Sequence, residues 1–217
     1  MASTAFVPLF PLGNQLVPGL VMPLVLFEPR YRELAKDLQT MPTEERRFGV
    51  IGIKAGREVG IGGASALFEI GTIAEVSELN ENPDGTFNLQ AVGSRRFQLL
   101  GLDDSRDYLQ AEVEFLDEPD GDDPEDAAIP VRRAFGAYRD AVGLRVDPSL
   151  LSPRLLSYIV TAAMVITPEE KQELLAAPDT SARLHLARRR LRQELRIISA
   201  LASLPAVDLV HSEMSAN

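Results

Sequence analysis

Side chains able to perform chemistry are few in this sequence, and they do not gather into one motif. The chain has two histidines, His185 and His211, and no cysteine. A zinc site needs several nitrogen or sulfur ligands at short spacing, and neither histidine has a second one nearby. The lack of cysteine also excludes a thiol nucleophile and a disulfide. We therefore expect no catalytic residue, no metal site and no cofactor, and we interpret both histidines as surface residues.

Carboxylates crowd into one short run, DEPDGDDPED at residues 117–126, which has seven acidic residues and no basic one. Oxygen ligands suit calcium, but the run lacks the spaced ligand pattern and the correspondingly placed glycine of an EF-hand loop. Two prolines within such a charged run are typical of a solvated linker. We favour the linker interpretation over a cation site.

The glycine-rich residues 60–63 (GIGG) raise the possibility of a phosphate-binding loop. Such a loop needs a helix that begins directly after the glycines, and usually a lysine, and neither follows here. We interpret the cluster as a turn or loop between strands.

A basic cluster occupies residues 180–196, where six arginines stand against one glutamate. It could meet an acidic partner or nucleic acid, or it could be a solvated helix face whose arginine stems cover apolar surface. The net charge of the chain is −10, with 10 basic and 16 acidic groups in residues 1–116 and 12 and 16 in residues 117–217. Because neither half has a net positive field, we favour the solvated face over nucleic-acid binding.

Residues 8–31 read PLFPLGNQLVPGLVMPLVLFEPRY and carry almost no charge. Five prolines rule out one continuous helix, so we expect short extended pieces joined by turns. Glu28 stands where a helix would begin, a position that favours its charge, and we interpret residues 27–31 (FEPRY) as an architectural corner. Apolar side chains near this corner are candidates for a groove that binds exposed hydrophobic segments. The candidate groove residues are Phe10, Phe27, Arg30 and Tyr31.

The elements that would position these residues differ between the two halves of the chain. In the first half, apolar spacing predicts a helix over residues 28–41, with Tyr31, Leu34, Ala35 and Leu38 buried. Alternation predicts strands over residues 47–54, 67–79, 86–100 and 108–116, with a hairpin turn at 82–85. The double arginine at 95–96 interrupts the alternation of the third strand. Strands linked by hairpins around one helix suggest a small closed or half-closed barrel.

The second half reads as helices. The first is predicted over residues 127–144 and the next begins after Ser152 as its N-cap. Thr167 and Glu170 form a capping box at the start of a short helix, and Asp179 or Thr180 caps a last helix that runs to about residue 204. We thus predict an α+β chain with a β-rich part at 1–118, a linker at 119–126, a helical bundle at 127–205 and a flexible tail at 206–217.

Composition adds limits on location. Hydrophobic residues make up 45% and charged residues 25%, as in ordinary soluble proteins. Residues 1–5 lack the basic start of a signal peptide, and the apolar runs are shorter than the roughly 18 residues that a membrane span requires. We expect a cytoplasmic protein that does not enter a membrane.

Residues 8–31 resemble, almost residue for residue, the opening of the N-terminal domain of Lon proteases, roughly LPLFPLGNVVLFPGMVLPLxIFEPRY. The resemblance continues through RFGV (47–50), EVG (58–60), IGTIA (70–74), PDG (83–85) and TPEEKQELL (167–175), and it covers about residues 6–204. It implies a PUA-like β pseudo-barrel followed by an α-helical bundle.

The resemblance also implies a function: a non-catalytic polypeptide-binding or adaptor module. The implied partners are exposed hydrophobic segments of unfolded chains, with a protease or chaperone beside them. Lon's ATPase carries a GxxxxGK loop followed by serine or threonine, but none of Lys36, Lys54 and Lys171 follows a glycine-rich turn. We therefore expect no enzyme.

Two other functions stay open at this point. PUA-like barrels elsewhere bind RNA, so an RNA- or nucleotide-binding module is the alternative, supported by the arginine cluster. An unrecognised hydrolase is a third, although no nucleophile motif supports it. The last helix is long enough to pair with a second subunit in a homodimer, and a bundle core explains its apolar stripe equally well.

Overall fold

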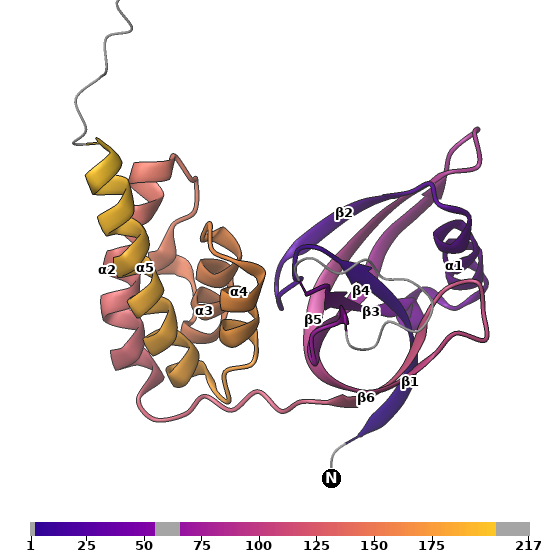
Figure 1. The fold of residues 1–217 in the computed structure, drawn as a ribbon, viewed down its shortest axis with the longest axis horizontal. Coiled ribbons are helices and arrows are strands. Elements are labelled where there is room, and N and C mark those ends of the chain that lie inside the picture. The colour runs from indigo at the N-terminus through magenta and orange to yellow at the C-terminus, as the bar shows by residue number, and fades with distance from the viewer. Residues whose placement is uncertain (1–2, 55–65, 203–217) are drawn as a thin grey trace, which may run out of the picture.

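A computed structural model describes residues 3–54 and 66–202 of the chain. The first half forms a β pseudo-barrel and the second half a helical bundle beside it (Figure 1). The predicted α+β class is thereby confirmed. The glycine cluster at 60–63, His211 and the predicted tail at 206–217 lie outside the described residues.

Five strands close into a ring, because β5 pairs with both β4 and β6. Around the ring the order is β5, β4, β3, β1, β6 and back to β5, with β1 and β3 parallel and all other pairs antiparallel. The strands of the ring are β1 (Thr4–Leu12), β3 (Arg47–Gly52), β4 (Ile70–Glu81), β5 (Phe87–Asp103) and β6 (Gln110–Phe115).

The sixth strand, β2 (Val21–Leu26), lies outside this ring and pairs with the first half of β5. Helix α1 (Pro29–Thr40) follows it, preceding a short 3-10 turn (Thr43–Glu45). The predicted stripe of α1 is confirmed: Tyr31, Leu34, Ala35 and Leu38 are buried in one core cluster with residues of β2, β4 and β5. Thus α1 covers the inner face of the β2–β5–β4 sheet, and the outer face is left to solvent.

The proline-rich opening behaves as its prolines predict, since it forms the extended β1 and β2 joined by a turn. Gly19 in that turn has φ +83°, a left-handed conformation that a side chain rarely adopts. A Cβ atom there would also lie 2.6 Å from Cδ1 of Leu155 in the helical bundle. Glycine at this position therefore serves both the turn and the close approach of the two parts.

Over the described residues 124–202, the bundle has four helices and a 3-10 turn (Pro148–Leu150). The first helix begins at Pro124, inside the predicted linker, because proline suits the first helical turn. The predicted caps are confirmed: Ser152 accepts from the Leu155 N–H, and Thr167 and Glu170 make both bonds of the capping box. Asp179, not Thr180, caps the last helix, since its Oδ1 accepts from the Ala182 N–H at 2.7 Å. The helices are α2 (Pro124–Val142), α3 (Pro153–Ala163), α4 (Pro168–Leu175) and α5 (Thr180–Ala202).

The barrel and the bundle pack through a seam that contains both apolar and ionic contacts. Val17 of the barrel packs with Tyr158 and Leu175 of the bundle. Beside them lies Arg96, the second arginine of the pair that interrupts the alternation of β5, with only 2% of its surface exposed. Its guanidinium group donates to the carbonyls of Leu175 and Ala177 at 2.7 and 2.8 Å. A barrel side chain thus holds the end of α4.

Candidate functional site

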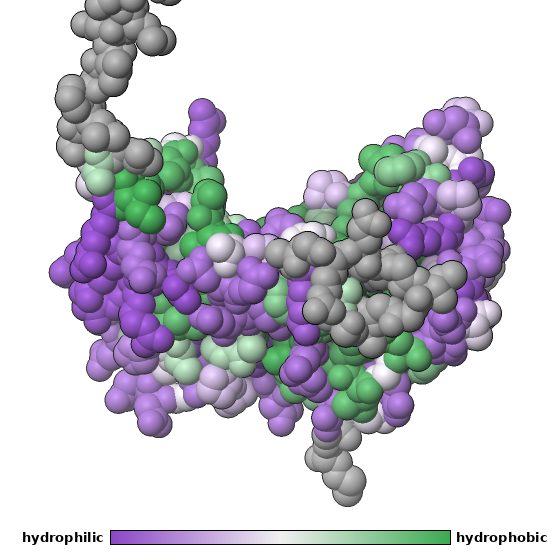
Figure 2. All heavy atoms as spheres, viewed as in Figure 1, coloured by the Kyte–Doolittle hydropathy of each residue, from purple (hydrophilic) through white to green (hydrophobic). Residues whose placement is uncertain are grey.

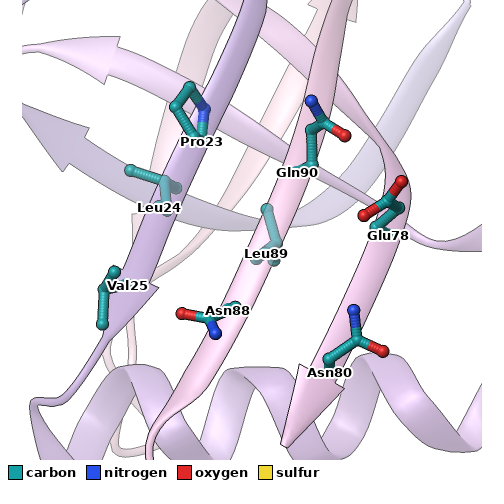
Figure 3. Close-up of a pocket in the computed structure, with 8 residues that line it drawn as sticks. All are labelled: Pro23, Leu24, Val25, Glu78, Asn80, Asn88, Leu89 and Gln90. Carbon is teal, nitrogen blue, oxygen red and sulfur yellow. The ribbon is translucent and has the colours of Figure 1, made fainter.

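The outer face of β2, β5 and β4 has a regular chemical order. Strand register places one residue of each strand side by side in three rows, and the β2 member of every row is apolar. Across β2, β5 and β4 the rows are Val21, Val92, Glu75; then Pro23, Gln90, Glu78; then Val25, Asn88, Asn80. Figure 3 shows side chains of the second and third rows on adjacent strands. The face therefore changes from apolar at its edge to amide and acidic toward the middle.

The apolar edge of this face is well exposed. Val21, Val25 and Phe27 expose 47%, 60% and 67% of their surface. Residues 1–27 contain no charged side chain at all. Figure 2 shows apolar surface along the upper rim of the barrel and again at the upper end of the bundle, with a hollow between them. Adjacent exposed apolar side chains are typical of binding surfaces.

A shallow hollow of about 500 Å³ lies over this face. None of the ion pairs among the described residues involves Glu75 or Glu78. The hollow thus combines apolar contact area with amide hydrogen-bonding groups and unpaired negative charge. It is lined by Pro23, Leu24, Val25, Glu78, Asn80, Asn88, Leu89 and Gln90.

The four residues predicted to line a groove separate into two pairs. Phe10 and Tyr31 are buried, with their rings stacked at a centroid distance of 4.1 Å, and burial raises the pKa of Tyr31. Phe27 is exposed, and Arg30 lies at the surface, paired with Glu28 at 2.8 Å and placed over the Tyr31 ring. Phe10 and Tyr31 therefore belong to the barrel core, and only Phe27 and Arg30 are accessible to a ligand.

Sequence reasoning passed over Val21, Pro23 and Val25, which form the exposed edge. Strand β2 reads VMPLVL, apolar on both faces, so its alternation does not reveal which face meets solvent. The sequence feature that could have identified them is the absence of charge over residues 1–27. Strands at the edge of a sheet commonly carry charged side chains, and β2 carries none.

A second hollow, of about 560 Å³, lies on the bundle between α4 and α5. Val165 and Ile197 in its wall expose 80% and 55% of their surface. Arg190 and Glu170 in its wall are paired at 2.7 Å, whereas the ion pairs of the described residues include neither Glu194 nor Arg196. Burial, and then the nearby Glu170, raise the pKa of Glu194. This hollow therefore combines apolar contact with one side chain of each charge that forms no described ion pair.

The interpretation of the basic cluster as a solvated face was wrong for Arg183. This side chain is fully buried, 4.1 Å over the Tyr158 ring, and donates to the Leu174 carbonyl at 3.1 Å. Burial lowers the pKa of Arg183 to about 10. Arg190 is committed to two glutamates, while Arg189, Arg192 and Arg196 are exposed. The cationic surface of α5 is therefore smaller than its sequence suggests.

Polar clusters elsewhere have structural explanations. Asp37 on α1 accepts from the Tyr108 hydroxyl at 2.6 Å and also binds Arg106, which ties α1 to the segment between β5 and β6. Burial, followed by Asp37, raises the pKa of Tyr108 to about 12, so this phenol is not poised as a base. In residues 3–54 and 66–202 no group of three histidine, cysteine or acidic residues is placed to hold a metal ion.

His185 is exposed on α5, as predicted. Over the same described part of the chain, no helix has the length and apolar character that crossing a membrane would take.

Residues 7–193 match a family model described as the ATP-dependent protease La (LON) substrate-binding domain. Among curated proteins, Lon protease 2 of Syntrophobacter fumaroxidans is 28% identical over 81% of this chain and 23% of its own length. The Lon protease of Methylocella silvestris is 30% identical over 86% of this chain and 24% of its own length. The chain therefore spans about a quarter of these relatives.

Two solved structures share the fold. A Lon N-terminal domain protein from Xanthomonas campestris matches with a TM-score of 0.59 and 25% identity, over 93% of this chain and 99% of the other. The N-terminal domain of a Mycobacterium avium complex Lon protease matches with a TM-score of 0.67 and 18% identity, over 87% of this chain and 98% of the other. The pseudo-barrel followed by a helical bundle is thus the arrangement of Lon N-terminal domains.

Proposed function

The chain belongs to the family of ATP-dependent protease La (Lon) substrate-binding domains, and on that premise we propose that it is a non-catalytic module that binds polypeptides. Its ligands are exposed hydrophobic segments of unfolded chains. One observation supports the proposal most strongly. Three exposed apolar side chains, Val21, Val25 and Phe27, lie in an uncharged segment beside an open hollow. Among residues 3–54 and 66–202, no cluster of metal-binding side chains competes with this use of the surface.

The chemistry of the surface suits a weak and permissive binder. Burial of apolar area stabilises a complex by about 25 cal/mol per Å², without demanding one particular side chain. The amides of Asn88 and Gln90 next to the apolar row can bond the polar main chain of an extended ligand. A segment from the interior of an unfolded protein has both features.

An adaptor needs its binding surface to be held rigidly with respect to the rest of the molecule. The Arg96 seam supplies that rigidity, because it fixes the barrel to the end of α4. We propose that the module presents bound segments to a protease or chaperone in the cytoplasm, with the apolar end of the bundle as the second contact.

The proposal is tested with a permanently unfolded, carboxymethylated protein as ligand. Titration should shift backbone NMR signals of β2 and its neighbours, and replacing Val21, Val25 and Phe27 by serine together should weaken binding about tenfold. Ile129 of α2 is 55% exposed, so Ile129→Ser is a matched control that should leave binding unchanged. Signals of β2 that do not move at saturating ligand would overturn the proposal.

The RNA- or nucleotide-binding alternative has less support from the structure. Arg183 is buried and Arg190 is paired, so two of the six arginines in residues 180–196 are not available to phosphates. The net charge of −10 opposes phosphate binding further.

A further inference from the structure

We propose that β2 binds its ligand by strand addition: an extended polypeptide segment pairs with the open edge of β2, so that main-chain hydrogen bonds supply much of the affinity. This inference rests on the proposed function, and it specifies the site and the ligand. The ligand is a segment of at least five residues that is free of proline, apolar on both faces and flanked by basic residues.

The first support is the open edge itself. Each strand of the closed ring has two neighbours, whereas β2 pairs with β5 alone among the described strands. No described backbone hydrogen bond from outside the sheet engages residues 21–26. In Figure 1, β2 runs along the upper margin of the barrel. An added strand therefore has a place to lie.

Alternate residues of β2 direct their main-chain N–H and C=O groups toward the open edge, which is the second support. The Leu20 carbonyl accepts from the Gly93 N–H at 2.9 Å, so residue 20 faces β5. Because successive residues of a strand direct their main-chain groups to opposite sides, residues 22, 24 and 26 also face β5, and Val21, Pro23 and Val25 face the open edge. The edge thus offers three carbonyls and two N–H groups, since proline has no N–H.

Pro23 agrees with this assignment, because a proline is tolerated where its missing N–H would point away from the sheet. It also disfavours the most obvious competing occupant, a second copy of the chain. Antiparallel pairing of two β2 strands centred on Pro23 would place two prolines opposite each other and lose both hydrogen bonds of the central pair. A different polypeptide meets only one missing donor.

The third support is the chemistry beside the edge. An added strand would place alternate side chains against Val21, Pro23 and Val25 on the outer face, and the others near the half-buried Met22 and Leu24. Both neighbourhoods are apolar. Exposed edges are commonly protected by lysine, but residues 1–27 carry no charge.

Electrostatics defines the ends of the ligand. Glu75 and Glu78 lie two strands from the edge and form no ion pair with a described residue, and the whole chain has a net charge of −10. Basic residues at the ends of an apolar segment would therefore be attracted toward this face.

The test uses the full chain and a nine-residue peptide of alternating valine and alanine, apolar on both faces, with a lysine at each end. Peptide should slow hydrogen exchange of the Val21 and Val25 amides, while those of Met22 and Leu24 are already protected by β5. A peptide with proline at its centre should bind about fivefold or more weakly, because it loses a donor and its extended pairing.

Two substitutions separate main chain from side chain. Val25→Ala removes the side chain and keeps the N–H, whereas Val25→Pro removes both, so the proline variant should bind the peptide about fivefold more weakly than the alanine variant. Pro23→Val adds an outward N–H and should tighten binding by a similar factor. Unchanged protection of Met22 and Leu24 shows that each variant keeps the β2–β5 pairing.

The outcomes distinguish this inference from the proposed function. If the peptide binds but Val25→Pro equals Val25→Ala and Pro23→Val has no effect, strand addition is wrong and the polypeptide-binding function stands. If neither peptide nor unfolded protein binds, both are wrong. Protection of Val21 and Val25 that grows with protein concentration in the absence of peptide would assign the edge to a second copy instead.

Discussion

The polar groups beside the two halves of β5 differ in whether they have hydrogen-bond partners. Its second half carries Arg96, whose guanidinium is buried and bonded to Glu118 and to the carbonyls of Asp117, Leu175 and Ala177. Its first half supports β2, whose outer main-chain groups face solvent with no described partner. The hydrogen bonds of Arg96 hold the two parts together, whereas the outward main-chain groups of β2 are the ones that we propose a ligand to bond.

Glu118 is the centre of the polar contacts around Arg96. It accepts from Arg96 Nε at 2.7 Å and from the Tyr158 hydroxyl at 2.6 Å, and lies 3.8 Å from Arg183. Two buried cations share this carboxylate, and desolvation makes such an arrangement costly to leave incomplete. We therefore predict that substitutions in the seam alter folding stability, and that substitutions in the open edge of β2 alter ligand binding.

The largest effect is expected for Arg96→Met. It removes the hydrogen bonds of Arg96 to Glu118 and to three carbonyls, and should lower the free energy of unfolding by about 3–5 kcal/mol, measured by urea denaturation. The neighbouring Arg95 is exposed over the Phe115 ring, so Arg95→Met is the control and should cost less than about 1 kcal/mol. Equal effects of the two substitutions would break the comparison.

A smaller loss of folding stability is expected for Tyr158→Phe. This substitution removes the hydrogen bond to the Glu118 carboxylate and keeps the packing of the ring. It should cost about 1.5–3 kcal/mol in the same denaturation experiment. Tyr138 is also buried, and its hydroxyl donates to the Ala163 carbonyl at 3.4 Å and accepts from the Val165 N–H at 3.2 Å. Because both bonds are long and neither involves a charged group, Tyr138→Phe should cost less. The reverse order would mean that Glu118 does not organise the seam.

At alkaline pH, Tyr158 should contribute less to the free energy of unfolding. Burial raises the pKa of Tyr158 well above its usual value of 10, so above about pH 10 the unfolded chain releases this proton while the folded chain retains it. The contribution of Tyr158 to the free energy of unfolding is therefore complete below pH 10 and falls as pH rises. The free energy of unfolding should therefore fall less steeply between pH 9 and 11 in Tyr158→Phe than in the unchanged protein, measured by denaturation at each pH. An unchanged slope would show that this phenol does not hold its proton.

The smallest effect on stability is expected at the edge. Val25→Ser replaces a side chain that is 60% exposed and should change the free energy of unfolding by less than about 0.5 kcal/mol. The same change should weaken binding of an unfolded polypeptide, measured by fluorescence anisotropy. A variant that loses stability but not affinity would show that β2 is a structural rather than a binding strand.

Local patterns in the sequence predicted most elements correctly. The apolar stripe of α1, the caps at Ser152 and Thr167 and the extended pieces of the proline-rich opening all depend on residues close together in the chain. They follow from periodicity, capping chemistry and the fixed φ of proline, which need no knowledge of distant contacts. The resemblance of residues 8–31 to Lon N-terminal domains likewise pointed to the family that the comparison then confirmed.

Only the tertiary structure decided which residues face solvent. Closure of the ring pairs β5 with both β4 and β6, which excludes β2 from the ring and buries Phe10 and Tyr31 under it. The same long-range packing turns Arg96 and Arg183 inward, although a local sequence pattern places arginine at the surface. Exposure depends on which elements pack together across the whole chain, and no short window of sequence contains that information.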